Sequence, residues 1–137
     1  MTPKPRALAA ICLVLSLGLP ACANETTRAQ TPVQALQAIE RAIGEAPCDS
    51  NADCRTIGVG AKACGGPERY LPWSVRYTQA DKLQRLVEQH RSLRTSENTR
   101  DGRVSNCAVV TDLGTTCVAR RCQMNPPGSD AGIQLTR

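Results

Sequence analysis

Six cysteines between positions 48 and 122 constrain this chain more than any other feature. A cysteine-free stretch divides them into two trios: Cys48, Cys54 and Cys64, then Cys107, Cys117 and Cys122. An even number of cysteines in a short exported chain indicates disulfide bonds. We therefore expect three disulfides, at least two of which join the trios and attach a first strand to a C-terminal hairpin.

The composition explains why such a chain needs covalent links. The 137 residues include no Phe, one Trp and two Tyr, so Val, Ile, Leu, Ala and cystine must form the core. Small domains bury too little surface to offset chain entropy by burial alone, and each disulfide stabilises such a fold by about 2–4 kcal/mol. These counts predict one small domain and exclude a large enzyme.

The N-terminus carries the pattern of an export signal. Lys4 and Arg6 precede an apolar run over residues 7–19, which is too short to cross a bilayer as a helix. The run ends in LPAC, which resembles the cleavage box of bacterial lipoproteins, where the cysteine becomes lipidated. We therefore predict a lipoprotein-type signal peptide over residues 1–21 and a lipid anchor on Cys22.

The sequence is compatible with two cleavage sites, one before Cys22 and one before Asn24. Ala23 directly follows Cys22, where inner-membrane lipoproteins often carry Asp, so a lipidated chain in a Gram-negative cell is predicted at the outer membrane, facing the periplasm. An ordinary signal peptidase would instead cut before Asn24 and leave a soluble periplasmic or secreted protein.

The chain after the signal divides into three segments. Residues 22–31 are polar and predict a tether, residues 32–125 carry the periodic patterns of a single domain, and residues 126–137 predict a flexible tail. The patterns within the domain indicate a small, disulfide-rich α+β fold with two helices packed on a short antiparallel sheet.

The first helix is predicted to begin after Thr31 and to end at Gly44. Thr31 is a suitable N-cap, Pro32 favours the first helical position, and Gln34 completes a capping box. Apolar residues then recur at helical spacing, and Gly44 is followed closely by a proline, which ends the helix.

A second helix is predicted to begin at Thr78, with Asp81 as its capping partner, and to end before a polar loop over residues 96–103. One face is apolar and includes the single histidine: Leu83, Leu86, Val87, His90 and Leu93. His90 is either a lone ligand or general base, or a residue at the edge of this apolar stripe. The second interpretation is preferred.

Runs of β-favouring residues predict the strands. One run covers residues 55–59, and a second region covers residue 104 and residues 108–110. Two further runs, at 115–118 and 122–124, are separated by a predicted turn at 119–121.

All three aromatic residues fall between positions 70 and 77, shortly after a predicted turn. Trp and Tyr serve as rigid anchors at interfaces, but a domain without Phe also needs its large side chains in a core. We prefer the core interpretation. The alternative makes this region a candidate binding site, formed by Gly65, Gly66, Pro67, Tyr70, Trp73 and Tyr77.

Metal-binding and catalytic patterns are weak. Cys117 and Cys122 enclose four residues, a marginal spacing for zinc, and export disfavours free thiolates. Asp49, Asn51 and Asp53 imitate the start of a calcium loop whose Gly and Glu are missing, so a side-chain-capped turn is preferred. The sequence also lacks the CxxC, GxSxG and HExxH motifs. We predict no metal, no cofactor and no catalytic residue.

The charge pattern argues against a nucleic-acid partner. Lys and Arg number 17 against 12 Asp and Glu, and acids are interleaved with the bases along the chain. No run of bases and aromatics forms a stacking groove.

The run from Cys48 to Ser74, with its CGGP turn and Tyr70, and the later segments NCAVV and TTCVARRC resemble a group of small cysteine-rich bacterial secreted proteins and lipoproteins. The resemblance covers residues 48–122. It implies the export compartment and the disulfides, and it implies no activity because the group is largely uncharacterised.

These features predict a class of function. We expect a non-enzymatic cell-envelope module, anchored by lipid, that binds an envelope protein or glycan through the loops around residues 64–77. One alternative is an inhibitor of exported hydrolases, which would present the disulfide-fixed loop 61–72 to a protease or lysozyme. Others are a small periplasmic enzyme and a structural envelope protein without a defined ligand.

Overall fold

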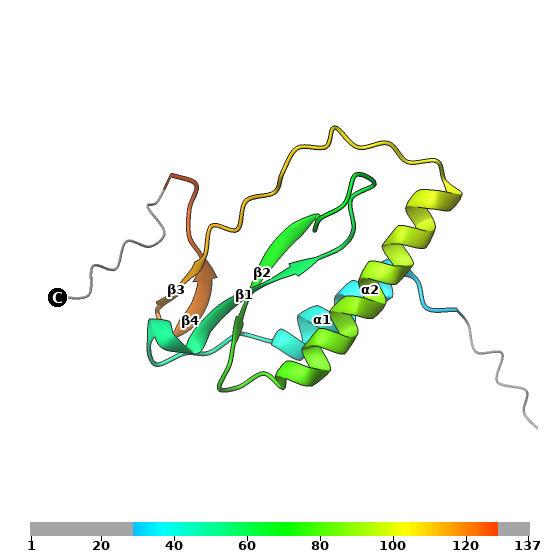
Figure 1. Ribbon diagram of the computed structural model, residues 1–137. Coiled ribbons are helices and arrows are strands. Elements are labelled where there is room, and N and C mark those ends of the chain that lie inside the picture. The colour runs from blue at the N-terminus through cyan, green and yellow to red at the C-terminus, as the bar shows by residue number, and fades with distance from the viewer. Residues whose placement is uncertain (1–28, 129–137) are drawn as a thin grey trace, which may run out of the picture.

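Two helices pack against one hairpin, and a second hairpin lies at the far end of the first (Figure 1). The computed structural model describes residues 29–128, in the order α1, β1, β2, α2, β3, β4, with a short 3₁₀ turn over Asn51–Asp53. Each hairpin is a separate antiparallel sheet. The predicted class, a small disulfide-rich α+β fold, is confirmed, with two small sheets where one was expected.

Helix α1 runs over Pro32–Ile43, as the sequence predicts. The Thr31 hydroxyl accepts a hydrogen bond from the Gln34 backbone N–H at 3.2 Å, and the Gln34 side-chain carbonyl accepts one from the Thr31 N–H at 3.0 Å. Gly44 ends the helix with a φ of 60° and donates its N–H to the Glu40 carbonyl at 2.9 Å. Local chemistry thus determines both ends of α1.

The first hairpin joins β1 (Cys54–Val59) to β2 (Arg69–Ser74), in a register that places Thr56 opposite Pro72. β1 extends the predicted strand by one residue. β2 has no counterpart among the predicted strands, because Pro72 weakens the strand signal of its sequence. Both strands of a two-stranded sheet are edges, where a proline without an N–H is tolerated.

Helix α2 covers Ala80–Arg100. Its N-cap is Gln79, one residue later than predicted, and Thr78 is buried before it. The predicted apolar stripe does face the core, since Leu83, Val87 and His90 are buried.

The C-terminal turns of α2 occupy most of the predicted polar loop over residues 96–103. Arg94 forms an ion pair with Glu97, and Asn98 donates its side-chain amide to the Ala61 carbonyl at 2.7 Å. The loop prediction was wrong because contacts with a distant part of the chain support a helix that its polar composition alone does not indicate.

The second hairpin joins β3 (Thr115–Val118) to β4 (Arg121–Met124). Ala119 and Arg120 form the predicted turn and both have positive φ, 48° and 62°. Residues other than glycine rarely adopt this conformation, so the turn needs support from its surroundings. Part of this support is a hydrogen bond from the Cys48 N–H to the Arg120 carbonyl at 3.0 Å.

An extended segment without secondary structure, residues 103–114, connects α2 to β3 along the outer edge of the molecule (Figure 1); we call it the strap. The strand predicted at residue 104 and residues 108–110 is wrong, because no strand within residues 29–128 pairs with this backbone. Cys107 also has a left-handed φ of 55°, which interrupts an extended run.

Two buried clusters stabilise the fold. The aliphatic cluster lies between the helices and the first hairpin and consists of Ile39, Val59, Leu83 and Val87. The cystine cluster connects the two hairpins and consists of Ala46, Cys48, Cys54 and Cys122. Both kinds of core follow from a composition without Phe, in which aliphatic side chains and cystine replace large rings.

Candidate functional site

All six predicted cysteines form disulfides, and every bridge joins one trio to the other. The pairs are Cys48–Cys117, Cys54–Cys122 and Cys64–Cys107, with Cα separations of 5.9, 5.4 and 5.4 Å. Cys117 and Cys122 lie opposite each other across the second hairpin, yet each bonds to the first trio. The bridges therefore attach β3 and β4 to β1 and to the segment before it, as the sequence predicts.

The acidic turn before β1 is capped by its own side chain. Asp53 Oδ2 accepts the backbone N–H of Asp49 at 2.8 Å and that of Ser50 at 3.0 Å. These two hydrogen bonds, with the Asp49 bond contributing most, hold the pKa of the Asp53 carboxyl below its usual value. The capped-turn interpretation of this segment is confirmed.

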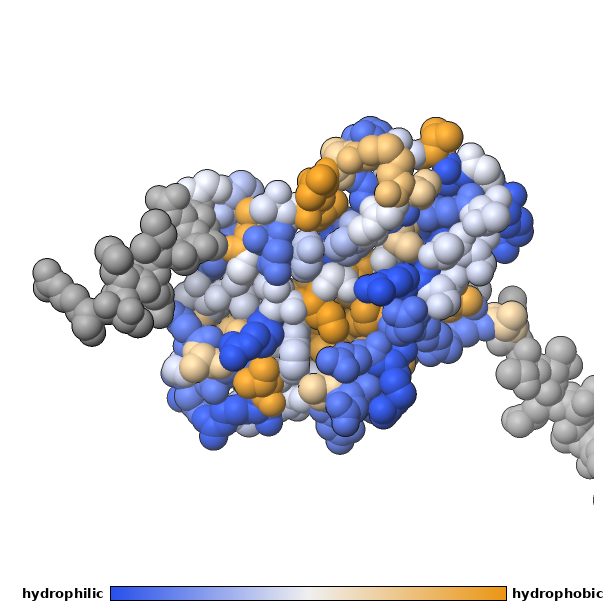
Figure 2. Space-filling model, viewed as in Figure 1, coloured by the Kyte–Doolittle hydropathy of each residue, from blue (hydrophilic) through white to orange (hydrophobic). Residues whose placement is uncertain are grey.

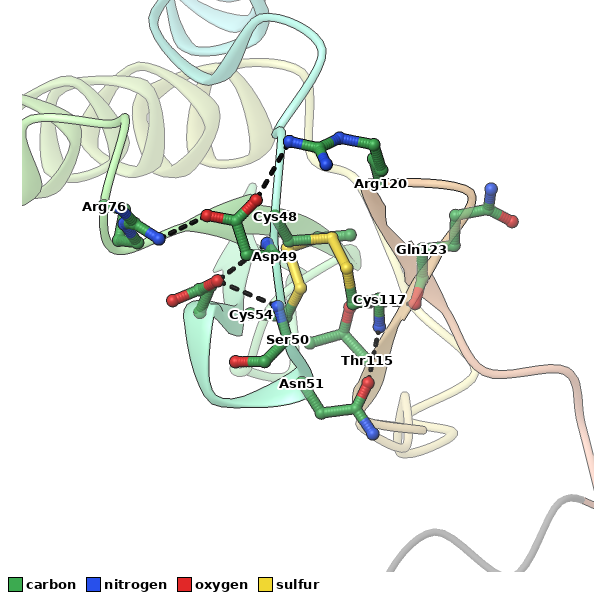
Figure 3. The surroundings of a disulfide bond; sticks show 12 residues. Cys48, Asp49, Ser50, Asn51, Cys54, Arg76, Thr115, Cys117, Arg120 and Gln123 are labelled. Atoms are coloured by element: carbon green, nitrogen blue, oxygen red, sulfur yellow. Dashed lines mark hydrogen bonds and ion pairs between the residues drawn. A yellow bond between two sulfur atoms is a disulfide. The ribbon is translucent and has the colours of Figure 1, made fainter.

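Three distant parts of the chain meet beside this turn (Figure 3). The Asp49 carboxylate forms ion pairs with Arg76, which follows β2, and with Arg120 in the second hairpin, the latter at 3.0 Å. Asn51 Oδ1 accepts the Cys117 N–H at 2.9 Å. Because both arginines are exposed, these ion pairs orient the turn more than they stabilise it.

Three sulfur atoms, those of Cys48, Cys54 and Cys122, lie within 4.8 Å of one another. Zinc is bound by thiolates, and each of these sulfurs is bonded to another sulfur in this structure. In the oxidised protein the group serves as packing in the cystine cluster.

The predicted glycine turn forms the tip of the loop between β1 and β2. Gly65 and Gly66 are exposed and have φ values of 93° and 78°, which only glycine adopts readily. The Lys62 N–H donates to the Gly66 carbonyl at 3.0 Å and closes the loop. Pro67 then packs on Gly58, where an added Cβ would lie 3.0 Å from the proline Cβ.

Tyr70 lines a groove of about 390 Å³ between the first hairpin and α2, which we call the Tyr70 groove. Pro67 belongs to the hairpin side, and α2 contributes Gln84, Glu88 and Arg91. Glu88 and Arg91 form an ion pair at 3.2 Å on the rim. In Figure 2 a small hydrophobic area lies between the hairpin and α2 and is bordered by hydrophilic residues.

The other two aromatic residues lie outside this groove and differ from each other. Trp73 is half-buried, packs against the aliphatic cluster and donates its Nε1–H to the Thr56 carbonyl at 3.3 Å. Tyr77 is 54% exposed, and the Arg76 guanidinium lies 5.5 Å from its ring centroid. The core interpretation therefore fits Trp73 and fails for Tyr77, because β2 ends at Ser74 and the chain then leaves the core.

His90 belongs to the apolar stripe of α2. It is only 3% exposed, and its Nδ1 has no hydrogen-bond partner among residues 29–128. Burial lowers the pKa of the imidazole, nearby Arg94 and Arg69 lower it further, and Glu68 opposes them. His90 is therefore a neutral, inaccessible side chain at neutral pH.

Sequence reasoning missed an ion-pair network centred on Arg94. Its Nε and Nη2 donate to Glu68 Oε1, the first at 3.0 Å and the second at 2.5 Å, and its Nη1 pairs with Glu97. The hydrogen bond to Glu68 contributes most to a raised pKa of Arg94. The spacing of Arg94 and Glu97 on one helix is a local signal, but Glu68 lies in another element and gives none.

The predicted lipidation site, Cys22, and the signal peptide lie outside the described residues. No helix within residues 29–128 is both long and apolar enough to cross a bilayer. Comparison of the chain with family models, with curated proteins and with solved structures gave no match.

Proposed function

We propose that this chain is an exported, lipid-anchored module of the cell envelope that binds a glycan in the Tyr70 groove and does not catalyse a reaction. The observation that carries the proposal is the groove itself. It combines an aromatic ring with an amide, a carboxylate and a guanidinium in an accessible hollow of about 390 Å³. Ligand sites typically combine an apolar surface with a few polar groups that orient the ligand.

The chemistry of the groove suits a sugar. A Tyr ring offers a flat apolar face for the C–H surface of a pyranose, and its hydroxyl can both donate and accept. Gln84 adds a donor and an acceptor, Glu88 accepts and Arg91 donates, so the groove offers both donors and acceptors to sugar hydroxyls. The mutual ion pair of Glu88 and Arg91 leaves the rim without a strong net charge.

Three disulfides support the exported part of the proposal. Disulfides persist in oxidising compartments, and two of the three attach the second hairpin to the rest of this fold. With the LPAC sequence ahead of them, they support a module that is anchored through Cys22 at the outer membrane and faces the periplasm. His90, the single histidine, is not available as a general base in the groove, because its imidazole is buried.

Cosedimentation with purified peptidoglycan sacculi tests the groove. We expect the oxidised protein, purified after export, to bind in a saturable way, and Tyr70→Ala to bind about tenfold more weakly. Tyr77→Ala is the matched control, since it removes the same side chain from an exposed position outside the groove. Lipopolysaccharide micelles provide a second glycan probe.

Two outcomes would overturn the glycan proposal. One is an absence of saturable binding to both sacculi and lipopolysaccharide by protein whose three disulfides are intact. The other is an equal loss of binding in Tyr70→Ala and Tyr77→Ala. An intact mass of the protein from its own host's membranes, with a diacyl or triacyl addition on Cys22, separately tests the anchor.

A further inference from the structure

The strap contains a short, exposed stretch that lies outside the Tyr70 groove. Val109 is 90% exposed, although it is a β-branched apolar residue in a chain poor in large apolar side chains. The backbone of residues 109–111 makes no hydrogen bond to any part of the chain that the structure describes. Figure 2 shows hydrophobic residues at the edge where the strap lies in Figure 1. An extended backbone with free donors and acceptors is thus presented to solvent.

This stretch is held firmly on its N-terminal side. The Cys64–Cys107 disulfide fixes the strap to the loop of the first hairpin. Lys62 Nζ donates to the Ala108 carbonyl, and Asn106 Oδ1 accepts the Ala108 N–H at 3.1 Å. The residue directly before Val109 is therefore anchored through its carbonyl and its N–H.

The C-terminal side is held as well. Thr56 Oγ1 donates to Asp112 Oδ2 at 2.5 Å, which connects the strap to β1. Asn125 Nδ2 donates to the Leu113 carbonyl at 3.0 Å, which connects it to the end of the second hairpin. Residues 109–111 consequently lie between two segments that are each fixed to the rest of the fold.

Such an arrangement matches what an endopeptidase cleft accepts. A protease binds its substrate as an extended strand through backbone hydrogen bonds, and one side chain enters the primary specificity pocket. A loop that already holds this extended form loses little entropy on docking. If the bond after Val109 were hydrolysed, the anchors on both sides would keep the two new ends together.

We propose that residues 108–112 form a substrate-like loop that occupies the cleft of a serine endopeptidase, with Val109 in a primary pocket for small aliphatic side chains. This inference rests on the proposed export of the module, but it uses a different surface from the Tyr70 groove. It differs from the expected inhibitory loop, residues 61–72. The last four residues of that loop, 69–72, belong to β2, whose backbone pairs with β1.

Inhibition assays with three serine endopeptidases test the proposal. The oxidised protein, purified after export, is titrated against elastase, chymotrypsin and trypsin with fluorogenic peptide substrates. We expect inhibition of elastase with a Ki of about 1 μM or lower, and much weaker inhibition of the other two. Val109→Lys should weaken elastase inhibition at least about tenfold and make the protein an inhibitor of trypsin.

Val104→Lys is the matched control. Val104 lies in the same strap and is 96% exposed, but it precedes the disulfide and lies outside the anchored stretch. We expect this variant to inhibit elastase as the wild type does and to gain no trypsin inhibition.

Three results would overturn the proposal: no elastase inhibition by protein with intact disulfides, equal loss in Val109→Lys and Val104→Lys, or rapid cleavage of the strap as an ordinary substrate. Failure here is separable from failure of the glycan proposal, because Val109→Lys should still bind sacculi. A Val109→Lys variant that misfolds would show altered disulfide mass or lost sacculus binding. Val109→Ala then replaces it, with the expectation that elastase inhibition is kept at a weaker level.

Discussion

The two ends of this molecule are stabilised by different means. At one end, α1, α2 and the first hairpin bury aliphatic side chains, of which Ile39 and Leu83 are fully inaccessible to solvent. At the other end, a hairpin of two four-residue strands is held to the rest of the fold by Cys48–Cys117 and Cys54–Cys122. Only the first end has enough secondary structure to form a core by packing alone.

The difference shows what cystine contributes to a fold of this composition. An isolated two-stranded hairpin is marginally stable in water, and the second hairpin also contains a turn with two positive φ values outside glycine. Hydrogen bonds from Cys48 to Arg120 and from Cys122 to Ala46 dock the hairpin, but they are few. We infer that the disulfides determine whether this end folds, whereas burial determines whether the helical end does.

The largest effect should come from removing both bridges of the cystine cluster. Replacing Cys48, Cys54, Cys117 and Cys122 with alanine opens two chain loops, which span 69 and 68 residues and almost coincide. The loop-entropy relation gives a loss of about 4 kcal/mol for one such loop. In urea unfolding monitored by hydrogen exchange, residues 115–124 should lose protection, while residues 83–90 keep part of theirs.

A single-bridge variant sharpens this expectation. With Cys54→Ala and Cys122→Ala, the Cys48–Cys117 bridge still closes a loop of nearly the same length, so the loss in stability should be much smaller than in the four-alanine variant. If removing one bridge lowers the stability as much as removing both, the stabilisation comes from packing in the cystine cluster and not from chain closure.

The next largest effect should come from the aliphatic end. Leu83 is fully buried at the centre of its cluster, and Leu83→Ala should lower the free energy of unfolding by about 3 kcal/mol through lost burial and a residual cavity. Val33→Ala is the control, because Val33 lies on α1 with 65% of its surface exposed and should change stability by less than about 0.5 kcal/mol. Chemical denaturation of the two variants measures this contrast, and similar values would contradict a packed helical end.

Trp73 is the aromatic residue that we expect to contribute to the stability of the helical end. It packs against the aliphatic cluster while remaining half-buried, so Trp73→Ala should lower the free energy of unfolding by about 2 kcal/mol, less than full burial would give. Tyr77→Ala should be close to neutral. Thermal unfolding by circular dichroism distinguishes them, and an unchanged melting temperature in Trp73→Ala would show that Trp73 is a surface residue.

Local signals in the sequence predicted the helical end well. The cap at Thr31, the glycine at position 44 and the apolar stripe of α2 all act within one or two helical turns, so they can be read without knowledge of the fold. The joining of the two trios was expected from the sequence, but the pairing of individual cysteines was not, because six cysteines allow fifteen pairings.

The errors fall where distant contacts decide the structure. The end of α2 depends on Asn98 reaching the Ala61 carbonyl, 37 positions away. Residues 108–110 favour strands, but a strand also needs a partner edge, and none is provided for the strap within the described residues. The Tyr70 groove requires the pairing of β1 with β2 and the position of α2, so the sequence indicated its aromatic residue but neither Glu88 nor Arg91.

The smallest predicted effect is the pH dependence of stability that His90 contributes at the helical end. Burial holds the pKa of His90 below the ordinary value of 6.5, whereas the unfolded chain titrates at that value. Between the two values the unfolded chain binds a proton that the folded chain does not, so stability is complete above pH 6.5 and falls as the pH is lowered through this window. The slope contributed by one group is at most about 1.4 kcal/mol per pH unit.

Glu68, Arg94 and Arg69 also act on His90, and Asp53 titrates only below its usual value of 3.8. Denaturant unfolding between pH 7.5 and 5.5 therefore isolates the histidine from the capped turn at the cystine end. We expect stability to fall toward pH 5.5 in the wild type and to change less in His90→Gln, which cannot bind the proton. An identical pH dependence in both proteins would show that His90 is already solvated in the folded state, and that α2 is not tightly packed at this position.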